Sequence, residues 1–385
     1  MTIAKLRLFN FGYFSVFAMF LSFLPVYLAA GGLPESQIGL ILAAGGIVGV
    51  FAQPFWGLVS DRARTIKKVL LPIFAFSLAL GFVLFQTSSA LAVGLLVGAM
   101  YFLFMPTDPL VESLNAQTAL RKNFPYGSIR MFGALGYASA SLLVGVVANH
   151  AGIQSLGYLF LGYGIATLLI GFATEDVSPS VTPLHINDMK KFLGRKETLS
   201  FFLLVFVLAL PHRMNDIFIG MYIGELGGDL RTVGYAWSLM TAAEVAFFAF
   251  AHRLTKPGME LGTIAVAGAL YVLRFALSAV VDSPAAVAAL QLMQGVTFVL
   301  FYTSAIQYLY AIVPEPWRAT GQTMLAVLFF GFSGILGSFF GGMVLERFGG
   351  DVLYGVMAAL SAAGAILCLL LRRRAGKAGG ARARG

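Results

Sequence analysis

Two apolar stretches of the sequence, QIGLILAAGGIVGVFAQPFWG (37–57) and TVGYAWSLMTAAEVAFFAFAH (232–252), resemble each other and decide the fold. Each is 21 residues long, and an α-helix needs roughly 20 apolar residues to cross the hydrocarbon core of a bilayer. The two stretches are offset by 195 residues. A second pair, LLVGVVANHAG ending at Gly152 and FGGMVLERFGG around Gly349, is offset by 197 residues. The near-equal offsets indicate an internal repeat of about half the chain.

The composition of the whole chain is that of a membrane protein. Of its 385 residues, 59% are apolar and 11% are charged, and the mean hydropathy is +0.85. Soluble domains are about 45–50% apolar and about 25% charged. We therefore predict an all-α membrane protein with twelve transmembrane helices in two pseudo-symmetric six-helix bundles. The predicted spans are 8–30, 36–59, 67–87, 90–119, 128–149, 155–174, 199–224, 232–252, 261–281, 285–313, 319–345 and 351–371.

A polar stretch, EDVSPSVTPLHINDMKKFLGRKET (175–198), separates the first six predicted spans from the last six. Its two prolines and its charged residues are typical of a linker between two domains. The predicted organisation is therefore an N-terminal six-helix bundle at 1–174, a linker at 175–198, a C-terminal six-helix bundle at 199–371 and a basic tail at 372–385.

The Lys and Arg residues outside the spans gather on one side of the predicted topology. The side with both termini and the linker holds 21 of them, whereas the other side holds only Arg231 and Arg347. Because basic loops stay in the cytoplasm, we predict a multi-pass protein of a bacterial inner membrane with cytoplasmic termini. We expect the first span to be retained rather than cleaved as a signal peptide. The net charge of +9 then reflects topology, and we expect no nucleic-acid partner.

Beyond the first two residues and the last residue of each predicted span, the spans contain seven Asp, Glu, Lys or Arg side chains and one histidine. A charge at the centre of a bilayer costs roughly 2.5–3.5 kcal/mol, so such residues are functional candidates. Asp108 and Glu112 lie four residues apart and share a helix face. Pro106 and Pro109 should loosen the helix that carries them. The other residues of this set are Arg130, His212, Arg213, Asp216, Glu244 and Arg274.

No pattern in the sequence indicates an enzyme, a cofactor or a metal. The chain has one cysteine, Cys368, and its four histidines have no metal-ligand spacing. Phosphate-binding loops and nucleophile elbows are absent from the sequence as well. We therefore expect the intramembrane charges to be partners that line a polar cavity. The alternative is that some pairs only lock helices together.

The stretch QPFWGLVSDRARTIKK (53–68) resembles the loop between the second and third helices of the major facilitator superfamily. The pattern of that loop is G-x-x-x-D-R/K-x-G-R/K-R/K. Gly57, Asp61 and Arg62 match it, and Arg64 stands where a glycine is usual. In the superfamily this loop latches the gate on the cytoplasmic side. The resemblance therefore assigns Gly57, Asp61 and Arg62 to a gating loop.

The stretches PLVES (109–113) and YGSIRMFGALGY (126–137) resemble helices four and five of the lactose permease and phenylpropionate permease branch. The resemblance implies that Glu112, Arg130 and Tyr137 bind the substrate, with Asp108 beside them. We expect Glu112 and Arg130 to face each other across the cavity. TAAEVAFF (241–248) and AGALYVLRF (267–275) are similar to helices eight and nine of the branch, and they contribute Glu244 and Arg274.

The tenth predicted span departs from this branch. QLMQGVTFVLFY (291–302) places Gln291 and Gln294 where lactose permease has a histidine and its proton-carrying glutamate. Neither glutamine can take up a proton, so a carboxylate elsewhere must do so, and we assign both glutamines to the substrate site. Asp108, Asp216 and Glu244 are the candidate proton carriers, and the predicted coupling side consists of Glu244, Arg274, Asp216 and His212.

The function that these observations predict is proton-coupled symport of a small organic solute by alternating access. A sugar, a nucleoside and an aromatic acid are all compatible substrates, and sodium is an alternative coupling ion. Proton-driven efflux of lipophilic compounds is the second hypothesis, and a non-transporting membrane sensor with the same fold is the third. We expect the lipid bilayer, the solute and the proton to be the partners of a functional monomer.

Overall fold

The computed structural model describes residues 2–179, 195–255 and 258–382. Over these ranges every regular element is a helix, and no strand is present. Eleven helical stretches are long and apolar enough to cross a membrane. The last, Thr320–Arg373, has 54 residues, far more than one crossing of about 30 Å requires. Gly349 interrupts it with φ 85° and ψ 171°, so this stretch holds two spans. The prediction of twelve spans is confirmed.

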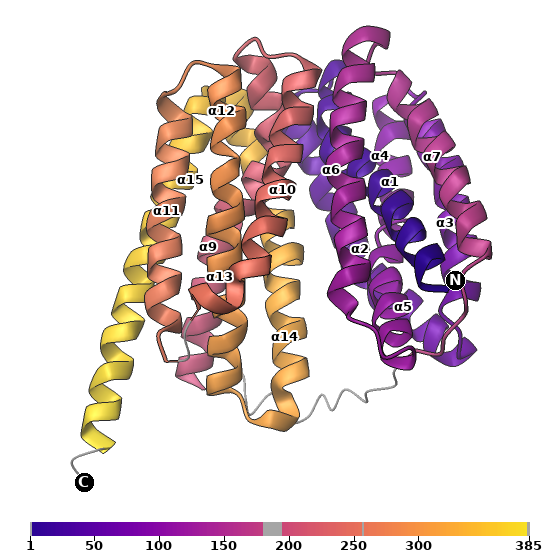
Figure 1. Cartoon of the computed structure of the whole chain (residues 1–385). Coiled ribbons are helices and arrows are strands. Elements are labelled where there is room, and N and C mark those ends of the chain that lie inside the picture. The colour runs from indigo at the N-terminus through magenta and orange to yellow at the C-terminus, as the bar shows by residue number, and fades with distance from the viewer. Residues whose placement is uncertain (1, 180–194, 256–257, 383–385) are drawn as a thin grey trace.

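The helices form two groups that lie side by side (Figure 1). In the first half, α4 and α5 together make the fourth span, and in the second half α12 and α13 make the tenth. The first group contains α1 (Thr2–Ala30), α2 (Glu35–Ala63), α3 (Lys67–Leu84), α4 (Ala90–Leu103), α5 (Thr107–Arg121), α6 (Tyr126–Ala151) and α7 (Ser155–Phe172). The second contains α9 (Lys196–Glu225), α10 (Leu230–Leu254), α11 (Glu260–Val280), α12 (Pro284–Leu290), α13 (Leu292–Ile312), η1 (Glu315–Trp317), α14 (Arg318–Ala326), η2 (Val327–Phe332) and α15 (Ser333–Arg382).

Helix breaks within the spans fall beside the candidate site. The break between α4 and α5 lies directly before Thr107, as the prolines predicted, because Pro106 lacks the N–H that a continuous helix needs. The π-helical turn η2 precedes α15, and such turns are frequent at functional sites. Most of the predicted linker, residues 180–194, lies outside the described residues, and the domain boundaries stay a prediction.

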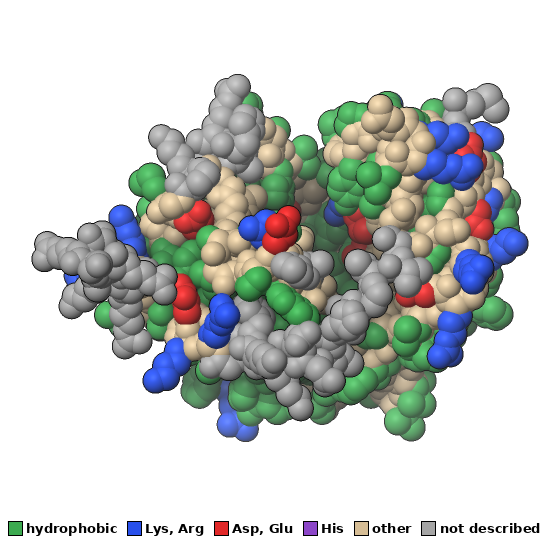
Figure 2. All heavy atoms as spheres, turned by 90° about the horizontal axis from the view of Figure 1, so that it is seen from below, with side chains coloured by type: hydrophobic (Ala, Val, Ile, Leu, Met, Phe, Trp, Pro, Cys, Tyr) green, Lys and Arg blue, Asp and Glu red, His purple; other side chains and the backbone are tan. Residues whose placement is uncertain are grey.

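We call the end of the molecule with Arg64, Lys122 and Arg195 the linker end, and the other end, with the turns at Gly32 and Gly152, the closed end. At the linker end a hollow separates the two halves (Figure 2). At the closed end the halves touch through backbone. A Cβ on Gly39 of α2 would lie 2.2 Å from the Ser338 carbonyl oxygen of α15.

A second contact of the same kind joins α6 and α10 at the closed end. A Cβ on Gly145 would lie 2.8 Å from the Leu230 carbonyl oxygen, and one on Gly234 would lie 2.6 Å from the Ser141 carbonyl oxygen. Gly39 and Gly234 are the positions that the 195-residue offset equates. The repeat found in the sequence therefore reappears as two equivalent glycine contacts, one on each side of the pseudo-symmetry axis. Only glycine allows backbones to approach this closely.

Gly39→Val should push α2 away from α15 at the closed end, because the side chain has no room in the contact. Overpacking of this kind costs about 1–3 kcal/mol, and the cost falls only on the conformation in which this end is shut. We expect spin labels on Leu33→Cys and Phe348→Cys to move to longer distances in double electron–electron resonance. Gly162→Val is the control, since that site has open space. Equal distances in both variants would contradict the inference that these glycine contacts hold this end shut.

Candidate functional site

Glu112 of α5 and Arg130 of α6 form an ion pair. The Arg130 Nε lies 2.7 Å from the Glu112 Oε1, and its guanidinium lies 4.1 Å from the centre of the Phe14 ring of α1. Sequence reasoning brought the two residues together, but it expected them to face each other across the cavity. That part is wrong, because the two side chains are in direct contact and no cavity separates them. The pair shields both charges within one wall of the hollow.

A second group on α6 also binds Glu112. The Tyr126 phenol donates a hydrogen bond to the Glu112 Oε2, so both carboxylate oxygens are occupied by residues one helical turn apart. Asp108 lies one turn before Glu112 and within electrostatic range of Glu112 and Arg130. Over the described ranges the Asp108 carboxylate has no hydrogen bond and no ion pair. It is half-buried, so its carboxyl group is open to a further partner beside the pair.

Tyr137 joins the two halves of the molecule nearer the closed end. Its hydroxyl is hydrogen-bonded to Ser22 Oγ of α1 at 2.8 Å, and its ring lies 6.0 Å from that of Trp237 of α10. Seven residues separate it from Arg130, which corresponds to about 10 Å along the helix. The predicted substrate residues of α6 are thus spread along one helix face, with aromatic side chains toward the closed end.

The second half carries an ion pair within α9. The Arg213 Nη1 lies 2.6 Å from the Asp216 Oδ2, and the His212 Nε2 lies 3.5 Å from the same oxygen. These residues follow Pro211 inside the helix, and the i, i+3 and i, i+4 spacings place them on one face. The prediction that His212, Arg213 and Asp216 lie close together is confirmed.

Gln294 connects this pair to the fully buried Arg274 of α11. The Arg274 Nη1 donates to the Gln294 Oε1, and the Nη2 donates to the Gln291 Oε1 at 2.9 Å. The Gln294 Nε2 in turn donates to the Asp216 Oδ1 at 3.2 Å. Among the described residues no carboxylate lies within ion-pair distance of Arg274. Two neutral amides therefore bind the Arg274 guanidinium, and the amide of Gln294 also links it to Asp216.

The two glutamines are buried, with exposed fractions of 0% for Gln291 and 1% for Gln294. In this conformation they contact Arg274 instead of the hollow. Gln291 also accepts from the Asn215 Nδ2 at 3.1 Å, and the Tyr354 hydroxyl donates to the Asn215 Oδ1 at 2.9 Å. The assignment of both glutamines to the substrate site stays a prediction. In the observed geometry they also stabilise the buried guanidinium of Arg274.

Glu244 of α10 stands apart from the residues with which it was grouped. It is half-buried and lies within electrostatic range of Asp216, Arg274 and, from the other half, Arg130. Over the described ranges its carboxylate forms no hydrogen bond and no ion pair. Sequence reasoning placed it on the coupling side with Arg274 and Asp216, and the structure places it near them without direct contact.

The predicted gating loop lies at the linker end. α2 carries Gly57, Asp61 and Arg62 in its last turns, and Arg64 follows in the left-handed conformation with φ 51° and ψ 33°. The tight turn for which the superfamily uses glycine is therefore retained with arginine. The amide of Arg64 donates to the carbonyl oxygens of Asp61 and Ser60, which closes the turn.

The start of the predicted linker is tied to this loop through Asp176, a residue that the sequence did not single out. Its Oδ2 accepts from the Thr65 hydroxyl at 2.5 Å, and its Oδ1 accepts from the Lys67 backbone N–H at 3.0 Å. The Lys67 ammonium donates to the carbonyl oxygens of Phe172 and Thr174 at 2.7 Å. Asp176 thus caps α3 from the end of α7, and the loop moves with the first half.

Tyr126 and Trp237 were also missed. A usable signal existed for Tyr126, because it lies four residues before Arg130 and so shares its helix face. For Trp237 the sequence offered only its position seven residues before Glu244. The described part of the chain contains no group of three or more His, Cys, Asp or Glu residues that could hold a metal ion.

Twelve membrane-spanning helices in two repeated halves, with charged residues on both walls of the hollow between them, define a secondary transporter. Comparison with known proteins agrees. The MFS_1 like family matches residues 3–356, and the chain belongs to this family of major facilitator transporters.

Two relatives and one solved structure illustrate the similarity. The uncharacterized transporter YwbF of Bacillus subtilis (strain 168) is 28% identical over 346 residues, which cover 89% of this chain and 86% of YwbF. The maltose permease of Geobacillus stearothermophilus is 26% identical over 378 residues, 97% of this chain and 95% of the permease. The crystal structure of the nucleoside transporter NupG has a TM-score of 0.86 at 18% identity and covers 96% of this chain and 99% of NupG. At that identity the NupG structure supports the fold alone.

Arg64→Gly should make the protein more stable, because an L-residue in the left-handed region costs about 1–2 kcal/mol that glycine does not pay. We expect a higher melting temperature in detergent, with the loop conformation retained. Arg64→Val should lower it, since a β-branched residue is still less tolerant of this conformation. The paired variants Arg62→Gly and Arg62→Val, inside α2, provide the control and should both destabilise. A lower melting temperature for Arg64→Gly would contradict the account of this turn.

Proposed function

We propose that this transporter moves a small organic solute together with protons by alternating access. The observation that carries the proposal is the distribution of charge: Glu112 and Arg130 on one wall of the hollow, and Glu244 on the other, within electrostatic range of Arg130. Charges inside a membrane protein are expensive unless a pathway uses them. Opposite walls of one hollow are the place where a solute can hold two rocking halves together.

The solute class that we propose is an uncharged, hydroxyl-rich compound such as a sugar or a nucleoside. Every arginine on the walls already has partners, since Arg130 binds Glu112, Arg213 binds Asp216 and Arg274 binds two amides. An aromatic acid would have to displace one of these acceptors. A hydroxyl group can instead donate to the free oxygens of Asp108 or Glu244. The similarity to a maltose permease supports the same choice.

We also propose the orientation. The linker end faces the cytoplasm, because it carries most of the basic residues outside the spans. The hollow then opens to the cytoplasm in this conformation (Figure 2). The Gly57, Asp61 and Arg62 segment lies at the side that must close when the transporter opens outward. In this proposal the segment controls the conformational change and does not touch the solute.

Glu244 is the proton carrier in this proposal. Protonation of Asp216 would break its ion pair with Arg213, which lies 2.6 Å away, and would leave a part-buried guanidinium without its partner. Protonation of Glu244 breaks no such pair and removes a free charge from a low-dielectric wall. Arg274 and Arg130 on its two sides can favour the charged form again when the hollow changes shape. When Glu244 returns to its charged form, it releases the proton.

Glu112→Gln should weaken solute binding by roughly 1.5–3 kcal/mol, the value of a hydrogen bond to a charged group. The variant removes the charge opposite Arg130 and keeps the volume of the side chain. Binding of radiolabelled maltose and of radiolabelled uridine to purified protein would measure the effect. The control is Asp282→Asn, an exposed carboxylate in the turn after α11. Normal binding by Glu112→Gln would show that the pair only packs helices.

Glu244→Gln should separate binding from coupling. A glutamine cannot release a proton, so solute exchange across proteoliposome membranes should continue while accumulation driven by a pH gradient is lost. Asp216→Asn should behave differently and lower protein stability, because Arg213 loses its partner. If Glu244→Gln still accumulates solute against its gradient, Glu244 is not the carrier.

A further inference from the structure

Tyr126 lies beside Glu112 and donates a hydrogen bond to it. It is the first residue of α6, one helical turn nearer the linker end than Arg130. Pro125 precedes it at the helix N-cap with φ −63° and ψ 117°, and Asn123 lies in the left-handed conformation with φ 48°. This short turn between α5 and α6 fixes where the helix begins. It thereby sets the phenol beside Glu112.

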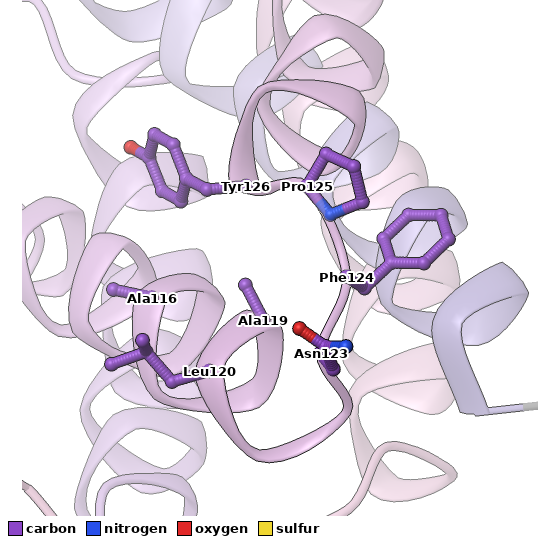
Figure 3. A pocket seen from close by; sticks show the side chains of 7 residues that line it. All are labelled: Ala116, Ala119, Leu120, Asn123, Phe124, Pro125 and Tyr126. Carbon is purple, nitrogen blue, oxygen red and sulfur yellow. The ribbon is translucent and has the colours of Figure 1, made fainter.

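The residue also lies on a cavity near the linker end. The cavity is a largely open depression, and its lining includes Ala119, Leu120 and Phe124. Figure 3 shows the Tyr126 and Phe124 rings on opposite sides of Pro125. Tyr126 is 41% exposed, so a solute in the hollow can reach it. A solute that leaves Glu112 toward the linker end meets this residue.

The hydrogen bonds of Glu112 show what the phenol does there. The charged Arg130 holds one oxygen at 2.7 Å, and the neutral Tyr126 hydroxyl holds the other. A hydroxyl-bearing solute offers Glu112 the same kind of donor as Tyr126 does. Exchange of one O–H donor for another at a carboxylate costs little net free energy, and the Glu112 side chain is 27% exposed, so a solute can reach it.

We propose that Tyr126 is the release residue of the substrate site, which donates to Glu112 in place of the solute when the hollow opens to the linker end. This role rests on the proposed function, because it takes Glu112 to be a solute ligand. The phenol satisfies Glu112 as the solute departs, so release leaves no unpaired oxygen. It also competes with solute for the same oxygen, and it therefore keeps affinity low on the side of release.

The test is Tyr126→Phe, which removes the hydroxyl and keeps the ring. Without the competing donor, radiolabelled maltose or uridine should bind roughly three- to tenfold more tightly, and solute exchange in proteoliposomes should slow by a similar factor. A hydroxyl that merely positioned Glu112 would give the opposite sign, with weaker binding. Tyr158→Phe is the matched control, since Tyr158 of α7 is 63% exposed. It should change neither quantity.

A second measurement needs no solute. A water-soluble carbodiimide modifies carboxyl groups, and mass spectrometry of the digested protein locates the adduct. Glu112 should react several times faster in Tyr126→Phe than in the wild type, because its Oε2 is no longer covered. Equal reaction rates would overturn the proposal, and so would weaker or unchanged solute binding by Tyr126→Phe.

If the proposed function is wrong, the binding measurements give a different pattern from the one expected if only the release role is wrong. If Glu112→Gln binds both probes as the wild type does, or if the wild type binds neither, the assignment of the substrate site or of its solute class is wrong. The carbodiimide measurement then still decides whether Tyr126 covers Glu112. If Glu112→Gln loses binding while Tyr126→Phe binds no more tightly than the wild type, only the release role is wrong.

Discussion

The cost of placing charge inside a membrane protein is the constraint on which the rest of this structure depends. Each guanidinium on the walls of the hollow has acceptors: Glu112 for Arg130, Asp216 for Arg213, and two glutamine amides for Arg274. Asp108 and Glu244, which have no hydrogen bond or ion pair among the described residues, are half-buried beside these pairs. On these walls, the carboxyl groups of Asp108 and Glu244 therefore remain available to a solute or a proton. The placement of these charges therefore bears on both the packing of the helices and the proposed transport.

The internal repeat explains how the two charged walls can move relative to each other. Equivalent glycines of the two halves close one end of the molecule, through Gly39 against α15 and Gly234 against α6, while the other end is open (Figure 2). One side-chain hydrogen bond accompanies each contact: the Ser36 N–H donates to Glu346 Oε2 at 2.8 Å, and the Ser238 hydroxyl donates to the Ala138 carbonyl oxygen at 2.6 Å. Two such contacts, related by the repeat, can open together when the halves rock. The charged walls lie between this gate and the linker end.

Most of the fold could be predicted from the sequence, because hydropathy and the offset of the repeats report directly on span length and on symmetry. That Glu112 and Arg130 both belong to the first half could be predicted from the spans, but their direct contact could not, since the resemblance led us to expect them on opposite sides of the cavity. The partners of Arg274 could not be predicted, since glutamine has no charge to mark it as a counterpart. Asp176 was missed for another reason, because its contact with Lys67 joins residues that are distant in the sequence. Tyr126 could have been found from its helical spacing to Arg130.

The central claim is that the charges of the two walls serve coupled movement of a small uncharged solute. The most direct test is the pH change in weakly buffered proteoliposomes that contain only this protein, when sugars and nucleosides are added in turn. We expect at least one of these solutes to make the external medium more alkaline as it enters, and to do so less in Glu244→Gln. Entry of the solute without any pH change, or no entry of any sugar or nucleoside, would contradict the account.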